Sequence, residues 1–211
     1  MNTPKPQPLP TRIGGFGGVS GLVTFLVQER ITHIVDATHP FAAQMSSNVL
    51  SAAALCGVKV TAFTRPAWQP VTGDQWQSVA SIDEAVSALA GPPQRVLLAI
   101  GRMHLSAFDA QPQHHYVLRL VDPPTSPLPL ANISTVIDRG PFTLEGDLTL
   151  LKNQRIQRIV CKNSGGDGAA SKLTAARMLD LPIVMIERPA LPPRHDVHRI
   201  DDVFSWLSDR Y

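Results

Sequence analysis

The chain of 211 residues contains only two cysteines, Cys56 and Cys161, and neither belongs to a CxxC pair. Two isolated cysteines provide neither a disulfide framework nor a zinc site, and they are typical of buried thiols in a reducing cytosol. The sequence also has no apolar run long enough to span a bilayer. We therefore expect a cytoplasmic protein that does not enter a membrane.

An excess of one charge is also missing, because the formal net charge is only +2 and the basic residues are scattered. This argues against nucleic acid as the main partner but allows a local basic pocket for an acidic small molecule. The histidines indicate no metal site, since His114 and His115 are adjacent, while His195 and His198 lack Cys or carboxylate neighbours. No GxSxG or Cys-His signature is found. The oligomeric state is not predicted.

What the sequence does contain is a segment typical of a parallel α/β sheet. An apolar run at residues 156–161 is followed by a glycine-rich loop at 163–168, a helical pattern to Leu179, and a second apolar run at 183–186. This order of strand, loop, helix and strand predicts a βαβ unit. Ligands bind at the carboxyl ends of such strands, so residues 162–172 are the first candidate site.

An internal repeat extends this prediction to the whole chain. Residues 15–35 match residues 140–160 with eight identities in 21 positions. The string Arg-Pro-Ala at 65–67 also recurs at 188–190. Similarity between two amphipathic helices explains a few identities, but not the shared order of elements.

The repeat predicts an α/β fold of two Rossmann-like parallel-sheet domains related by internal duplication, with a ligand cleft between them. We place the domains at residues 1–91 and 92–211. The second copy begins with strands at 95–100 and 116–121 that have no counterpart in the first. We therefore expect the first domain to lack its opening strand, and about 30 residues to be missing before Met1.

The loop after Lys162 fits an anion site. The Ser164 hydroxyl, the ammonium groups of Lys162 and Lys172, and the amides at the next helix start are all suited to negative charge. It is not a P-loop, because Ser171 occupies the position of the glycine before the lysine. The alternative is a flexible connection. By the repeat, its partner is the Ala37-Thr38-His39 loop, in which His39 is either functional or a hydrogen-bonded structural residue.

A second glycine cluster at Gly15, Gly17 and Gly18 precedes a helix, and Asp36 follows at the distance of a ribose-binding acid. This pattern is a weak match to a dinucleotide fingerprint, because GxGxxG fails at Ser20. A structural turn that lets the helix approach the sheet is the alternative, and the second copy favours it by having Gly-Pro-Phe at 140–142.

Several strings together resemble the precorrin-6A reductase family, NADPH-dependent enzymes of cobalamin biosynthesis. They are IVDATHPFA (34–42), GR (101–102), RGPF (139–142), VCKNSGG with GAASKL (160–173) and IERP (186–189). The resemblance covers about residues 12 to 192. It implies two Rossmann-like domains that hold NADPH and a tetrapyrrole substrate, and hydride transfer to a double bond of precorrin-6A to give precorrin-6B.

On this basis we assign roles to the candidate residues. The catalytic candidates are Lys162 and His39, either of which could deliver a proton. The substrate-binding candidates, suited to the carboxylates of the macrocycle, are Asp36, Thr38, His39, Arg139 and Lys162. The cofactor-binding candidates are Gly101, Arg102, Asn163, Ser164, Gly165, Gly166 and Lys172.

The sequence departs from the resemblance at one point, because the N-terminal strand and glycine-rich GGT-type loop of that family are not found in it. The rival interpretations are a non-catalytic two-lobed module that binds a nucleotide or acidic metabolite, and a nucleotide-dependent transferase that uses the turn at residues 14–18.

Overall fold

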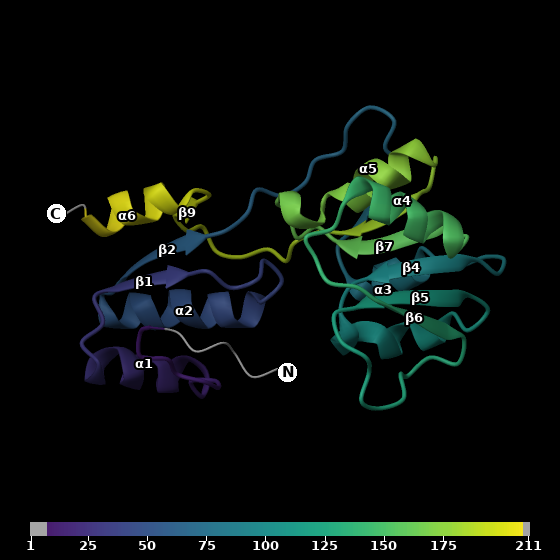
Figure 1. Cartoon of the computed structure of the whole chain (residues 1–211). Coiled ribbons are helices and arrows are strands. Elements are labelled where there is room, and N and C mark those ends of the chain that lie inside the picture. The colour runs from purple at the N-terminus through teal and green to yellow at the C-terminus, as the bar shows by residue number, and fades with distance from the viewer. Residues whose placement is uncertain (1–7, 209–211) are drawn as a thin grey trace. The chain divides into compact units, whose positions relative to one another are not determined.

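The computed structural model of the chain describes residues 8–208. By its internal contacts the chain forms two units (Figure 1). Within the described residues, unit 1 comprises residues 8–38, 42–64 and 191–208, and unit 2 comprises 39–41 and 65–190. No helix among these residues has the length and apolar character needed to cross a membrane.

Unit 2 contains a six-stranded sheet in which every neighbouring pair is parallel, with the order β3-β8-β7-β4-β5-β6. The strands are β3 (Trp76–Val79), β4 (Arg95–Ala99), β5 (His115–Leu120), β6 (Ile133–Ile137), β7 (Arg158–Lys162) and β8 (Ile183–Ile186). If β4 to β8 are counted as the first five strands and β3 as the sixth, this is the Rossmann order 3-2-1-4-5-6.

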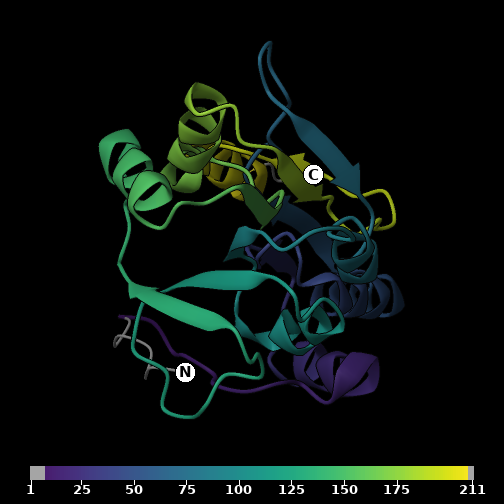
Figure 2. The same cartoon turned by 90° about the vertical axis from the view of Figure 1, so that its right-hand side faces the viewer.

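Helices cover both faces of this sheet (Figure 2). One face packs against α3 (Ile82–Ser87) and the 3₁₀ segment η1 (Arg102–Ala110), and the other packs against α4 (Leu144–Asn153) and α5 (Ser171–Met178). A short 3₁₀ turn, η2 (Asp167–Ala169), precedes α5. Successive residues of β4 alternate between the two cores, since Val96 and Leu98 join one and Leu97 joins the other. Burial on both faces explains the continuous apolar runs in the sequence.

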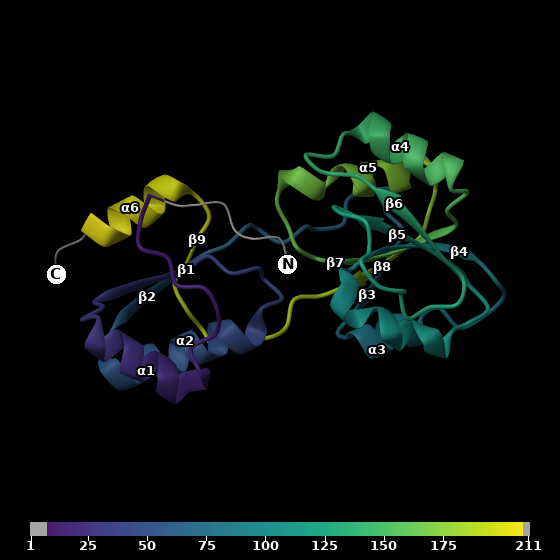
Figure 3. The same cartoon turned by 60° about the horizontal axis from the view of Figure 1, so that its bottom comes forward.

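Unit 1 is a smaller version of the same architecture (Figure 3). Its parallel sheet has the order β1-β2-β9, formed by β1 (His33–Asp36), β2 (Lys59–Phe63) and β9 (Asp196–Val197). Helices α1 (Gly18–Gln28) and α2 (Ala43–Cys56) pack together on one face, and α6 (Ile200–Ser208) lies on the other. The α1–α2 core centres on Leu22, Leu26 and Val49.

The structure repeats the element order that the sequence repeat predicts. Arg30 and Arg155, which correspond in the two copies, both follow a helix and adopt the rare left-handed backbone with φ of 52° and 49°. Strands β1 and β2 then correspond to β7 and β8. The third strand of each set is exchanged, because β3 from the first copy joins unit 2 and β9 from the second joins unit 1.

The α/β fold class is confirmed, and two helix ends show well-defined caps. Gly57 ends α2 in the left-handed conformation, and the Ser81 hydroxyl caps α3 by accepting a hydrogen bond from the Glu84 amide at 3.1 Å. The Glu84 carboxylate accepts from the Ala80 amide at 2.8 Å. The strands β6 and β9 were not predicted. The predicted domain boundary between residues 91 and 92 was derived from the sequence repeat and not from the packing of the two units. It stays a prediction.

Candidate functional site

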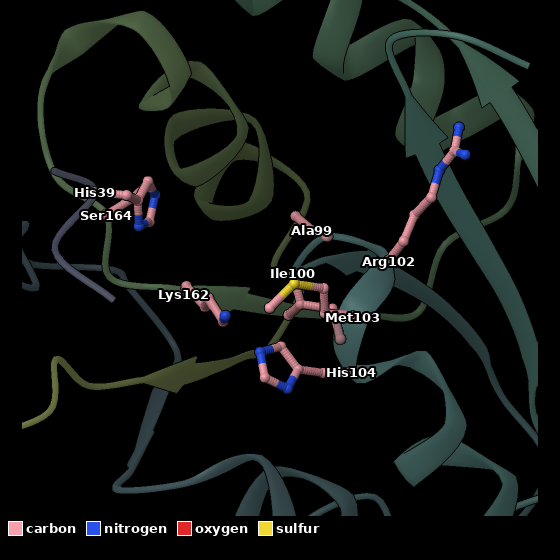
Figure 4. Close-up of a pocket in the computed structure, with 9 residues that line it drawn as sticks. His39, Ala99, Ile100, Arg102, Met103, His104, Lys162 and Ser164 are labelled. Atoms are coloured by element: carbon pink, nitrogen blue, oxygen red, sulfur yellow. The ribbon is translucent and has the colours of Figure 1, made fainter. Parts of the chain in front are cut away.

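After the two central strands of unit 2, β4 and β7, the chain turns toward opposite edges of the sheet. β4 continues through η1 to β5 on one side, and β7 continues through α5 to β8 on the other. Ligands of open parallel sheets bind outside the carboxyl ends of the strands at such a reversal. A cavity of about 370 Å³ lies there (Figure 4). Its lining residues are His39, Ala99, Ile100, Gly101, Arg102, Met103, His104, Lys162 and Ser164.

The lining combines basic and apolar groups and includes no carboxylate. Four of the lining residues carry a lysine, arginine or histidine side chain, and Ala99, Ile100 and Met103 supply apolar surface. A negatively charged substituent on an apolar frame would find matching groups in such a cavity. The candidate site is therefore suited to an amphiphilic anion.

Lys162 is the last residue of β7, and its side chain extends into the cavity (Figure 4). Its ammonium nitrogen lies 4.9 Å from the ring centroid of Phe41. None of the ion pairs formed within residues 8–208 includes Lys162. Burial lowers the pKa of this ammonium below its usual 10.5. Lys162 is thus an unpaired cation that gives up its proton more readily than a surface lysine.

His39 lines the same cavity. Its Nδ1 accepts a hydrogen bond from the Phe41 amide at 3.2 Å, so the neutral ring carries its proton on Nε2. Burial, followed by the positive charges of Arg65, Lys162 and Arg188, holds the pKa of His39 below its usual 6.5. At neutral pH the ring is therefore uncharged and has an N–H group to donate.

Gly101 and Arg102 follow β4 and line the wall of the cavity across from His39 (Figure 4). Gly101 has φ of 80°, which favours glycine. Arg102 donates to the Asp122 carbonyl oxygen at 2.7 Å, and its guanidinium points away from Lys162 (Figure 4). The exposed Arg139 forms an ion pair with the Asp122 carboxylate at 3.2 Å. Arg139 is thus connected to Arg102 through Asp122, but it does not line the cavity.

Asn163 lies beside Lys162, but its side chain binds within the protein. The residue is only 2% exposed. Its amide nitrogen donates to the Trp68 carbonyl oxygen at 3.0 Å and to the Glu187 carboxylate at 3.1 Å. Its amide oxygen accepts from the Trp68 backbone N–H at 2.8 Å. Asn163 therefore ties the end of β7 to the segment at residues 65–68.

Gly165 and Gly166 also lie against the segment at residues 65–68. Gly165 has φ of 69°, and a Cβ atom there would lie 2.0 Å from the Pro66 carbonyl oxygen. Gly166 has φ of 74°, and its carbonyl oxygen accepts from the Trp68 indole N–H at 2.8 Å. Only glycine permits so close an approach of the two backbones.

Arg188 follows β8 and binds the same loop. Its guanidinium donates to the carbonyl oxygens of Asn163 at 2.9 Å, Arg65 at 2.8 Å and Ser164 at 3.2 Å. The arginines that begin the two Arg-Pro-Ala strings therefore lie together at this loop. Their positive charges also act on His39.

Lys172, predicted to bind the cofactor, is buried away from the cavity lining. Its ammonium group donates to the Ala169 carbonyl oxygen and lies 4.3 Å from the ring centroid of Trp68. Burial lowers its pKa below the usual 10.5. In this structure Lys172 supports the start of α5 and the position of Trp68.

Asp36 and Thr38 belong to unit 1, where the Asp36 carboxylate lies in a hydrogen-bond network. Asp36 accepts from the Thr38 hydroxyl at 2.7 Å, the Ser46 hydroxyl at 2.6 Å and Arg194 at 3.2 Å. Burial raises the pKa of Asp36, but the hydrogen bonds from Ser46 and Thr38 and the Arg194 charge outweigh it, so that the pKa lies below 3.8. This geometry indicates a structural role for Asp36.

Replacing Asp36 with Asn is expected to destabilise the protein by about 1–3 kcal/mol, because the partly buried Arg194 loses one of its two carboxylate partners. A carboxylate whose pKa is lowered by folding contributes stability above its unfolded pKa, and this contribution is lost as the pH falls through the folded value. Thermal unfolding below and above pH 4 measures both effects. Asp201→Asn is the control, since the Asp201–Arg199 pair is exposed. Equal melting temperatures for the two variants would contradict the structural role.

Sequence reasoning missed His104. This histidine lies two residues after Arg102 in η1, faces the cavity and is half-buried. Its only signal in the sequence was its nearness to the Gly101-Arg102 loop. Among residues 8–208 no group of three or more His, Cys, Asp or Glu side chains is placed to hold a metal ion.

Comparison with known proteins gives consistent matches along the chain. The family model described as precorrin-6x reductase CbiJ/CobK matches residues 1–208. A precorrin-6A reductase of Rhodobacter capsulatus is 54% identical over 206 residues, which cover 98% of this chain and 82% of that protein. A precorrin-6A reductase of Sinorhizobium sp is 49% identical over 185 residues, covering 88% of this chain and 71% of that protein.

A solved structure agrees with these matches. The structure of a protein described as CobK precorrin-6A reductase superposes with a TM-score of 0.93 at 55% identity, covering 96% of this chain and 83% of that one. A cobalt-precorrin-6A reductase of Priestia megaterium is more distant, at 31% identity over 81% of this chain and 70% of that protein.

Proposed function

The chain belongs to the precorrin-6x reductase CbiJ/CobK family, and from this premise we propose that it transfers a hydride from NADPH to a double bond of precorrin-6A, giving precorrin-6B. It is an oxidoreductase of cobalamin biosynthesis. The observation that supports the proposed chemistry is the carboxylate-free basic cavity at the reversal between β4 and β7. The tetrapyrrole carries acetate and propionate groups, which are the anions that such a cavity suits.

The proposed cofactor fits the residues around Gly101. A Cβ atom at Gly101 would meet no atom within 4 Å, so the backbone after β4 is open to a ligand. We assign cofactor binding to Gly101, Arg102 and Ser164, which line the cavity at the ends of β4 and β7. When bound, NADPH supplies the hydride. The protein places the two reactants and excludes water.

Reduction of the double bond also requires one proton, and Lys162 is our candidate donor. Burial lowers its pKa while leaving its ammonium unpaired, which favours proton transfer at moderate pH. His39 is the second candidate, through its Nε2–H group. Because its neutral form predominates at neutral pH, we assign His39 primarily to hydrogen bonding with a substrate carboxylate.

The remaining predicted residues receive supporting roles in the proposal. We assign Asn163, Gly165, Gly166 and Lys172 to fixing the loop that carries Ser164, on the basis of their contacts with residues 65–68 and 169. Asp36 and Thr38 fix the loop that leads to His39. Arg139 is exposed and is assigned to a peripheral carboxylate. The predicted position of the ligand cleft between the domains stays a prediction.

Two finer points complete the proposal. We assign cobalt-free precorrin-6A as the substrate, because the relatives at 54% and 49% identity are described as precorrin-6A reductases, and the relative at 31% as a cobalt-precorrin-6A reductase. We also propose a cytoplasmic location, which the free thiols of Cys56 and Cys161 fit.

Nicotinamide absorbance tests this function against the binding-module alternative, which the matches do not favour. The chain, NADPH and precorrin-6A are mixed, and the absorbance is followed with and without the tetrapyrrole. We expect NADPH to be consumed only when precorrin-6A is present, and NADH to be consumed more slowly. Binding of NADPH without oxidation in the presence of precorrin-6A would support the binding module instead.

A further inference from the structure

His104 is placed to contact a ligand in the cavity. It belongs to η1, which begins directly after Gly101, and its ring lies on the side of the cavity that Lys162 enters (Figure 4). The positive charge of Lys162 acts on the ring, and together with burial it lowers the pKa of His104. The imidazole and the ammonium therefore face the same part of the cavity.

The His104 ring has no hydrogen-bond partner among residues 8–208. The contrast with His114 is informative, because both ring nitrogens of that residue bind backbone groups, those of Gln94 at 3.1 Å and Leu89 at 2.7 Å. His115 also has a partner, the Ser134 hydroxyl at 3.0 Å. A half-buried imidazole that is not used internally and faces a cavity is available to a ligand.

We propose that His104 is a substrate-binding residue that donates a hydrogen bond to a carboxylate of the macrocycle held against Lys162. The inference rests on the function proposed above. We place one edge of the macrocycle, with its acidic side chain, in this cavity. In this arrangement the carboxylate lies between Lys162 and His104 and binds both. His39 lies beside Ser164 (Figure 4).

The surroundings favour the macrocycle over a cofactor phosphate at this position. Phosphates in Rossmann-like folds bind the backbone amides at the start of a helix, which here corresponds to Gly101 and Arg102. His104 lies beyond that start, next to Ile100 and to Met103, whose side chain is 87% exposed. Apolar groups beside a lysine and an imidazole N–H donor suit a carboxylate attached to a hydrophobic ring.

Two substitutions test the proposal in the full chain. His104→Ala is expected to raise the KM for precorrin-6A about tenfold, the loss of one charge-assisted hydrogen bond. The KM for NADPH and kcat should change little. His104→Gln keeps an N–H donor at a similar distance and should recover most of the affinity. His115→Gln is the matched control, because His115 lies at the amino end of β5, the opposite end from the cavity.

Binding of precorrin-6A without cofactor gives a readout that does not depend on turnover. The Kd should rise about tenfold in His104→Ala and remain unchanged in His115→Gln, with equal melting temperatures. A KM and Kd for precorrin-6A within about twofold of the parent would overturn the inference and leave the reductase function intact. A rise in the KM for NADPH instead would assign His104 to the cofactor. Absence of NADPH oxidation by the parent chain contradicts the proposed function, and the Kd comparison still tests His104.

Discussion

Replacing Lys162 with methionine is expected to lower kcat for precorrin-6A reduction by about 10²–10⁴-fold, the range for removal of a general acid. Methionine has a similar length and can still pack against Phe41, so the fold should be retained. The loss arises because the ammonium at the end of β7, whose pKa burial lowers, is the proton donor in the proposed reaction.

The pH dependence separates the two roles of Lys162. The ammonium is the active form, so turnover of the parent chain should fall as the pH rises through its pKa, which burial places below 10.5. The methionine variant should lack this alkaline fall. Lys162→Arg keeps the charge but not an available proton, so a low kcat with an unchanged KM indicates proton donation. Lys152→Met in the last turn of α4 is the control, and a kcat within about threefold of the parent for Lys162→Met would contradict the assignment.

Replacing Gly165 with alanine is expected to destabilise the protein by about 2–4 kcal/mol and to lower kcat/KM at least tenfold. A residue other than glycine at φ of 69° is strained, and the new Cβ atom would lie 2.0 Å from the Pro66 carbonyl oxygen. That oxygen belongs to backbone and cannot move cheaply. Ser164, which lines the cavity, would shift with the loop.

Gly168→Ala provides the matched control in the same loop, because a Cβ there meets no atom within 4 Å and its φ is not positive. Thermal unfolding and steady-state kinetics of the two variants measure the difference. For a chain of this size we expect Gly165→Ala to melt roughly 4–16 °C lower, and Gly168→Ala to melt with the parent. Equal melting temperatures for the two variants would mean that the close approach to Pro66 does not constrain the loop.

The sequence predicted a candidate site at particular strand ends, and the structure brings several of these residues together. Lys162, Ser164, Gly101 and Arg102 follow two buried apolar runs, and parallel pairing of β4 and β7 places their carboxyl ends side by side. His39 was found through the repeat. Their placement around one cavity follows from a parallel sheet, which converts order along the chain into position at one edge, and their roles stay predictions.

The uses of the buried polar residues could not be predicted in the same way. Asn163 lies next to Lys162 in sequence, but its amide binds Trp68, 95 residues away. Lys172 likewise packs on Trp68. A local sequence pattern indicates from which strand or helix a side chain projects. It does not indicate which distant backbone group will form a hydrogen bond with that side chain. The exchange of β3 and β9 between the units was missed for the same reason, because either sheet offers an edge to a short parallel strand.

Hydride transfer to the macrocycle is tested most directly with NADPH that carries deuterium at the transferred position of the nicotinamide. The chain is incubated with this cofactor and precorrin-6A in ordinary water, and the tetrapyrrole product is analysed by mass spectrometry. We predict a product heavier than that from unlabelled NADPH by the mass difference between deuterium and hydrogen, and no such product from the Lys162→Met variant on the same time scale. Release of the deuterium to water with an unlabelled tetrapyrrole, or no change in the tetrapyrrole at all, would contradict the account.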